Sequence, residues 1–189
     1  EQLITLHLDA LATAAAGGAN DFGVELAGRA DVTKLAIFGH SRGAERAVAL
    51  ARQWATDGET RSYGPVDGVL LIAPAIAFVD PAGGVPVPMA LINAACDGDV
   101  TDQTGQIFFE AARLAPAQQT WAAAVWLERA NHNYFNDTLP GDPFGTPGRL
   151  DCDPLLDGDA QRAFLVAYAG DFLTAVFSVT PAQVRAALE

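Results

Sequence analysis

The feature that most constrains this chain is a Gly-x-Ser-x-Gly pentapeptide at residues 39–43. The apolar run at residues 34–39 predicts a buried strand, and residues 43–56 repeat small apolar side chains with helical spacing. A strand that runs directly into a helix requires a sharp turn, in which glycine permits close approach of the two elements. We therefore expect Ser41 at the tip of a strained turn, with both flanking glycines required because a Cβ at either would collide with a neighbouring element.

A serine at such a turn is a candidate nucleophile. Its hydroxyl would project toward a substrate, and the first amides of the following helix, that of Arg42 above all, would point at a developing oxyanion. A serine hydroxyl also needs a base and an orienting acid, which follow this turn in the order acid, then histidine. An ordinary glycine-rich turn without chemistry is the alternative.

Only one of the three histidines follows the serine in the chain. His132 opens a stretch at residues 129–158 in which Asn, Asp, Gly and Pro cluster, and a long loop in a compact domain is usually functional. We expect His132 to be the base, the alternative being a solvated side chain. His40 lies within the turn, and Tyr134 with Phe135 follows the histidine, so these three are candidate pocket residues.

The candidate acids follow an apolar run at residues 89–93. Asp97, Asp99 and Asp102 lie within six residues of one another. Asp97 is our choice because its offset from the strand is the usual one for a carboxylate that orients an imidazole. Asp99 is the competing acid, and Asp102 is expected to be a helix N-cap.

The pattern of apolar runs predicts the α/β class, with a mostly parallel sheet and flanking helices. The expected strands are residues 34–39, 69–73, 89–93 and 120–127. The expected helices are residues 3–16, 43–56, 106–114 and 160–177, and a short one that begins at Thr180. We expect Trp121 and Trp126 to lie in the core. No linker or repeat divides the sequence, so residues 1–189 are expected to form one domain.

Composition excludes several kinds of partner. The 23 acidic and 11 basic residues give a formal charge of -12, which argues against nucleic acid and anionic membranes. No apolar run approaches the roughly 20 residues of a membrane helix. The two cysteines, Cys96 and Cys152, fit either one disulfide from an oxidising compartment or two reduced thiols. Neither has metal-ligand spacing, so no metal site is expected.

Together these segments resemble the α/β-hydrolase superfamily, and in particular secreted actinobacterial hydrolases of the esterase and lipase type. The resemblance rests on residues 39–45, 66–74, 96–100 and 131–135. It implies hydrolysis of a small-molecule or lipid-like carboxylic ester through an acyl-enzyme, without a cofactor. Ser41 would attack the ester carbonyl, His132 would shuttle the proton, and Asp97 would orient the His132 ring. The resemblance also implies a disulfide between Cys96 and Cys152 and a location outside the cytoplasm.

The sequence departs from this family before the serine. Family members usually place several strands there, whereas one predicted helix and one predicted strand precede Ser41. We therefore expect the first strands of the sheet to belong to an N-terminal portion of the same protein that these residues lack. That portion would also supply the second oxyanion amide, which makes it an expected partner of this chain.

Two other functions stay open at this point. A peptidase or an acyltransferase uses the same three residues, because the pocket and the acyl acceptor decide the reaction. A non-catalytic interaction module of hydrolase fold would use the sheet edge that absent strands leave exposed. The combination of the strained turn with a downstream histidine argues against the module.

Overall fold

The strands of this protein form one parallel sheet. The computed structural model describes residues 2–57, 61–116, 118, 120–139 and 152–177. Its strands are β1 (Leu35–His40), β2 (Val66–Ile72), β3 (Met89–Ala94) and β4 (Ala122–Leu127). They lie in the order of the sequence, and all three neighbouring pairs are parallel. The predicted α/β class is therefore confirmed, and each predicted strand is found with small differences at its ends.

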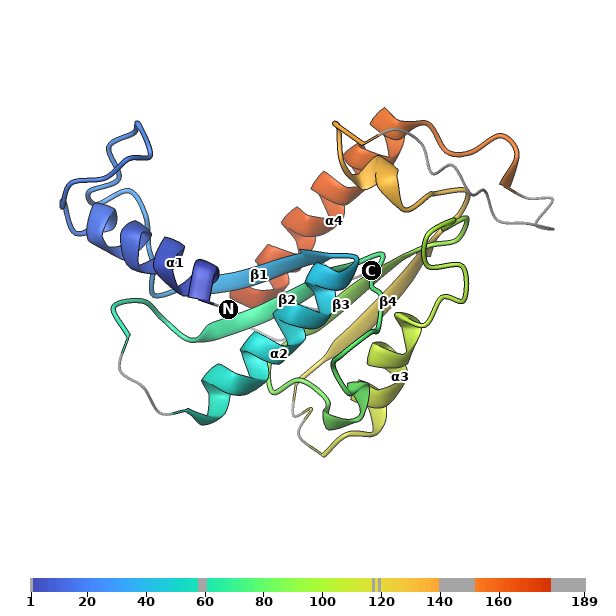
Figure 1. Ribbon diagram of the computed structural model, residues 1–189, viewed down its shortest axis with the longest axis horizontal. Helices are drawn as coiled ribbons and strands as arrows, with labels where there is room; N and C mark the ends of the chain where they lie inside the picture. Colours follow the sequence, from blue (N-terminus) through green and yellow to red (C-terminus); the bar gives the residue numbers. More distant parts are fainter. Residues whose placement is uncertain (1, 58–60, 117, 119, 140–151, 178–189) are drawn as a thin grey trace.

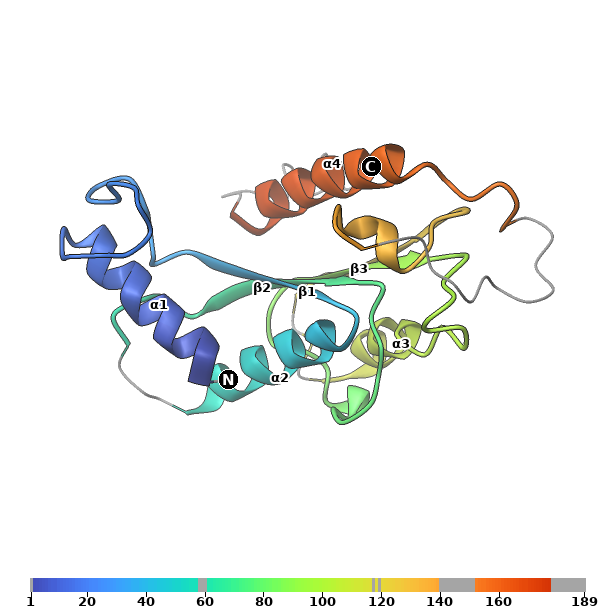
Figure 2. The same cartoon turned by 45° about the horizontal axis from the view of Figure 1, so that its top comes forward.

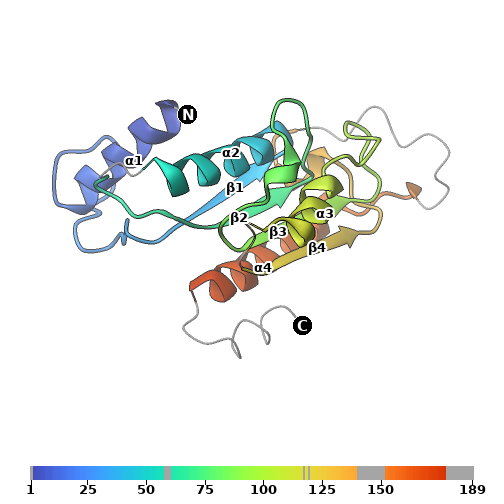
Figure 3. The same cartoon turned by 90° about the horizontal axis from the view of Figure 1, so that it is seen from below.

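Helices cover both faces of the sheet (Figure 1). They are α1 (Gln2–Ala15), α2 (Arg42–Thr56), α3 (Gln106–Leu114) and α4 (Gly158–Phe177). Figure 2 shows α4 on one face and α2 with α3 on the other. Helix α1 lies at one end of the molecule, near the start of β1 (Figure 3). The helix expected from Thr180 lies outside the described residues.

The two central strands are apolar on both faces because helices cover both faces. Successive side chains of a strand point to opposite faces, so each strand contributes to two separate layers of core. The layer under α4 contains Leu70, Ile72, Ala90, Ile92 and Phe172. The layer under α2 and α3 contains Val69, Leu71, Met89, Leu91 and Phe108. These layers fix the carboxyl ends of the strands, where the candidate site residues lie.

The two tryptophans differ in their burial. Trp121 packs edge-on against Phe172, with the ring centroids 5.8 Å apart, as expected of a core residue. Trp126 is 47% exposed, so the prediction that it lies in the core is wrong. It belongs to β4, which pairs only with β3 in the described sheet and buries its side chains only partly. Strand propensity does not distinguish an edge strand from a central one.

Among the described residues, β1 forms the other edge of the sheet. Its Phe38 is partly exposed and meets Phe172 of α4 edge-on, with the ring centroids 5.8 Å apart. None of the described helices combines the length and the apolar character that crossing a membrane requires.

A buried carboxylate ties helix α2 to the segment that follows β2. Oε2 of Glu45, in the first turn of α2, accepts hydrogen bonds from the amides of Ala77, Phe78 and Val79 at 3.0, 2.8 and 3.1 Å. Burial by itself raises the pKa of Glu45, but the three amide donors outweigh it and the pKa is lowered. The segment at residues 74–79 is therefore held against the start of α2.

We expect Glu45→Gln to lower the free energy of unfolding by about 2 kcal/mol at pH 7, because a neutral oxygen replaces the charged acceptor. Folding lowers the pKa of Glu45 below its ordinary 4.5. The contribution of the carboxylate is therefore complete above that pH and is lost as the pH falls through the lowered pKa. Urea unfolding of both proteins at several pH values measures this difference.

The control is Glu128→Gln, which alters an exposed glutamate and should change the stability by less than about 0.5 kcal/mol. Equal effects of the two substitutions at pH 7 would contradict the role of Glu45.

Candidate active site

The turn between β1 and α2 holds Ser41 in a backbone conformation that side-chain-bearing residues rarely adopt. Its φ is 56° and its ψ is -127°. The Ser41 amide donates to the carbonyl of Ile72 at 2.9 Å, and the Ser41 carbonyl accepts from the amides of Ala44 at 3.0 Å and Ala75 at 3.3 Å. Bonds on both sides thus hold the strained residue in place. Arg42 follows directly as the first residue of α2, where amides lack a partner within the helix.

The two glycines of the turn have different surroundings. A Cβ on Gly39 would lie 2.4 Å from the carbonyl oxygen of Gly43 and 2.6 Å from the nitrogen of Ala44. No side chain fits there. Around Gly43, no described atom outside its two chain neighbours and the nearby backbone of its own helix lies within 4 Å of the position of a Cβ. The prediction that close packing requires both glycines is therefore right for Gly39 and wrong for Gly43.

Asp97 and His132 come together from the loops that follow β3 and β4. Nδ1 of His132 lies 2.8 Å from Oδ2 of Asp97, and both side chains are buried. The second oxygen of Asp97, Oδ1, accepts hydrogen bonds from the amides of Asp99 and Val100 at 2.9 and 2.6 Å. A carboxylate bonded through both oxygens has a fixed orientation, and it fixes the imidazole in turn.

Asp99, the competing acid, lies at the other nitrogen of the same ring. Its Oδ2 is 3.4 Å from Nε2 of His132, and its side chain is 62% exposed. The two candidate carboxylates therefore flank the imidazole, with Asp97 at Nδ1 and Asp99 at Nε2. The sequence predicted that Asp102 is a helix N-cap, and this prediction is wrong. Helix α3 begins later, and Gly105 occupies its N-cap position.

His40 connects the turn at Ser41, the serine turn, to the loop after β4 that carries His132, the histidine loop. Its ring packs on that of His132, with the centroids 4.6 Å apart, and the ring of Phe135 lies 6.3 Å away. Burial first, and the neighbouring His132 second, lower the pKa of His40. The Nε2 atom of His40 is 2.9 Å from the carbonyl oxygen of His132, so a neutral ring protonated at Nε2 donates to this carbonyl. Tyr134 is half-buried, and its carbonyl accepts from Arg162 of α4 at 3.4 Å.

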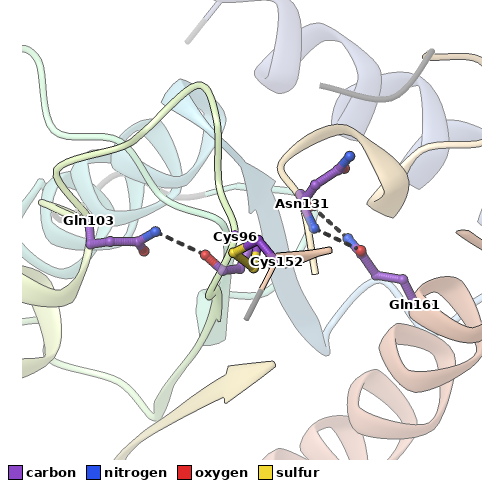
Figure 4. Close-up of a disulfide and its surroundings, with 6 residues drawn as sticks. Cys96, Gln103, Asn131, Cys152 and Gln161 are labelled. Carbon is purple, nitrogen blue, oxygen red and sulfur yellow. Dashed lines mark hydrogen bonds between the residues drawn. A yellow bond between two sulfur atoms is a disulfide. The ribbon is translucent and has the colours of Figure 1, made fainter. Parts of the chain in front are cut away.

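Two buried amide side chains that the sequence had not indicated hold the histidine loop (Figure 4). Gln161 of α4 accepts from the Asn131 amide at 3.1 Å and donates to the Asn131 carbonyl at 2.7 Å. Oδ1 of Asn131 accepts from the amides of Asn133 and Tyr134, both at 2.9 Å, and so closes the turn around His132. A glutamine in a helical pattern is usually exposed, so the sequence carried no signal for this contact.

A disulfide joins Cys96 to Cys152 (Figure 4), which confirms the expected pairing. Cys96 directly precedes Asp97, and its amide donates to the carbonyl of Ala130 at 2.8 Å. Nε2 of Gln103 donates to the carbonyl of the last residue of β3 at 3.0 Å. The loop after β3 that carries Asp97, the acid loop, is thus fixed to the histidine loop and to the chain before α4. Structural disulfides are typical of proteins outside the reducing cytosol.

The part of the chain that the structure describes contains no group of three or more His, Cys, Asp and Glu side chains able to hold a metal ion.

Comparisons with known proteins identify the fold. No protein-family model matches the chain, and no curated protein matches it significantly. Solved structures of esterase 2 from the planctomycete Thermogutta terrifontis match the chain. The native and propionate-bound forms are 18% and 19% identical, cover 92% of this chain and have TM-scores of 0.50. The apo form is 18% identical over 77% of this chain, with a TM-score of 0.47. The likeness shows the fold.

This chain therefore shares the α/β fold of the native and propionate-bound structures over the matched region. It covers 57% to 66% of the length of these esterase chains.

We expect Gly39→Ala to prevent the turn from forming, because its Cβ would overlap backbone atoms that no rotamer change can move. The matched control is Gly43→Ala, whose Cβ meets open space and which should fold normally. Circular dichroism and urea unfolding of the two proteins measure the difference. A stable Gly39→Ala protein would show that the turn does not depend on this close approach.

We expect Gln161→Ala to lower the free energy of unfolding by about 2 kcal/mol, because it leaves the buried amide and carbonyl of Asn131 without their partner. Gln53→Ala removes an exposed glutamine from another helix and is the control. Denaturant unfolding of both variants gives the comparison. If both substitutions cost the same, Gln161 does not hold the histidine loop.

Proposed function

We propose that this chain carries the catalytic residues of a serine hydrolase that cleaves carboxylic esters through an acyl-enzyme. Ser41 is the nucleophile, His132 the base and Asp97 the orienting acid. One observation carries this proposal: the strained Ser41 is linked through His40 to a buried imidazole and carboxylate only 2.8 Å apart. The esterase-like fold supports it.

In this mechanism Asp97 accepts a hydrogen bond from Nδ1–H of His132, which keeps the proton on Nδ1 and leaves Nε2 able to take a proton from Ser41. The serine oxygen attacks the ester carbonyl, and the resulting oxyanion accepts a hydrogen bond from the amide of Arg42. His132 then gives its proton to the departing alcohol. Water then attacks the acyl-enzyme while His132 takes its proton, and this proton passes to the Ser41 oxygen as the acyl–serine bond breaks and the acid leaves, so the reaction needs no cofactor. His40, Tyr134 and Phe135 are the proposed pocket residues.

The substrate we propose is a small-molecule or lipid-like ester, and the disulfide supports a secreted location. Because the chain covers only 65% to 66% of the native and propionate-bound esterase structures, we propose that a further portion of the same protein supplies the second oxyanion amide. Activity is therefore to be measured in this chain and in the longest available form of the protein.

The test is hydrolysis of short and medium p-nitrophenyl esters, with Ser41→Ala as the blank. We expect hydrolysis that disappears in this variant, and covalent labelling of Ser41 by a fluorophosphonate. A peptide amide of the same acyl group, and an added alcohol as acyl acceptor, separate esterase from peptidase and acyltransferase. No labelling in any form of the protein would favour the non-catalytic module.

Asp97→Asn should lower kcat by about 1,000-fold or more while KM changes little, because an amide in this place holds the wrong tautomer of His132. The matched control is Asp102→Asn, an exposed aspartate of the same loop, which should have a near-normal rate. A normal rate in Asp97→Asn would remove Asp97 from the mechanism.

A further inference from the structure

We infer that Asp99 selects substrates by charge, so that the enzyme prefers esters whose alcohol part is positively charged. This inference rests on the proposed hydrolase function and names the class of substrate that the same site takes. It starts from the position of Asp99 at Nε2 of His132, where its Oδ2 lies 3.4 Å away.

Asp99 lies close to the nitrogen that serves the alcohol part of the ester. Nε2 of His132 is the nitrogen that gives a proton to the departing alcohol, so the alcohol oxygen must come within hydrogen-bonding distance of it. The carboxylate of Asp99 then lies within roughly 6 Å of that oxygen, since both are neighbours of one atom. A charge on the alcohol part of the ester therefore meets Asp99 before any other described carboxylate that contacts the ring.

Asp99 is also accessible from outside the protein. The side chain of Asp97 is buried against the imidazole, whereas that of Asp99 is 62% exposed at the same ring. Of these two carboxylates, therefore, only that of Asp99 can contact a bound substrate. Its backbone is nevertheless fixed, because the Asp99 amide donates to Oδ1 of Asp97 at 2.9 Å. The carboxylate is thus carried on an anchored turn next to the imidazole.

The charges around the ring also favour a cation beside Asp99. Titratable groups of the described residues that contact His132 include Asp97, Asp99 and His40. Burial lowers the pKa of His40, which keeps it neutral near pH 7. No ion pair of the described residues joins Asp99 to a lysine or an arginine. A cationic substrate would supply the missing counter-charge, and an anionic one would be repelled.

Asp99 has no place as the orienting acid in this arrangement. An orienting acid accepts a hydrogen bond from Nδ1–H, and Asp97 occupies that position at 2.8 Å. A carboxylate at Nε2 lies on the side of the ring that faces the substrate. Its chemistry is therefore that of a charge presented to the ligand, and this assigns Asp99 to specificity.

The experiment compares three butyrate esters of similar size: the choline ester, its neutral isostere 3,3-dimethylbutyl butyrate, and the anionic 3-sulfopropyl butyrate. Acid release at constant pH and low salt gives kcat/KM for each. We expect kcat/KM of the choline ester to exceed that of the neutral ester by about tenfold, and the sulfopropyl ester to be poorer by a similar factor. Added salt should reduce both ratios.

The deciding variant is Asp99→Asn, which should bring the three values to within about threefold of one another. Asp102→Asn removes the same charge from the same loop without contact to His132, and should leave the ratios as they are. Ratios do not depend on the fraction of folded enzyme, so partial unfolding cannot imitate the result.

Unchanged ratios in Asp99→Asn, with the neutral ester still hydrolysed, would overturn the charge selection and leave the proposed function standing. An equal loss on all three esters would also overturn it, because Asp99 would then belong to the reaction itself. If the wild-type protein shows no Ser41-dependent hydrolysis of any ester, the proposed function fails first.

Discussion

The buried carboxylate of Asp97 is the interaction on which the rest of the candidate site depends. Burying a carboxylate away from water costs free energy unless hydrogen bonds replace its hydration. Two backbone amides and the His132 ring supply these bonds to Asp97. Those amides belong to the loop after β3, and His132 belongs to the loop after β4. The carboxylate therefore requires both loops to close on the same point at the carboxyl end of the sheet.

Several contacts act together to meet that requirement. The disulfide and the amide of Cys96 hold the acid loop, and Gln161 holds the histidine loop through Asn131. The serine turn is held from other directions, by the bonds of Ser41 to the residues that end and follow β2. Each of the three loops is thus fixed by its own neighbours, and His40 joins the turn to the histidine loop.

The sequence was informative where a physical constraint has a local signature. The central strands are continuous apolar runs because both faces are buried, and the turn shows itself by its glycines. Contacts that depend on tertiary partners left no such signature. Glu45 and Gln161 look like ordinary polar residues of helices, yet both are buried and bonded to backbone. Trp126 looked like a core residue because a tryptophan in a strand is usually buried. Its exposure follows from the position of β4 at the edge of the described sheet, which the sequence does not reveal. Gly43 matched the motif without any described neighbour that would exclude a side chain.

The disulfide also has a topological consequence. It spans 56 positions of sequence, and the closed ring of chain includes Asp97, α3, β4 and His132. A protease that cut the chain once inside this ring would leave two pieces that are still one covalent molecule. The proposed acid and base would then stay at high effective concentration relative to each other, however the chain was nicked between them. Such a ring would protect the arrangement of the two loops against a single cut in the chain between them.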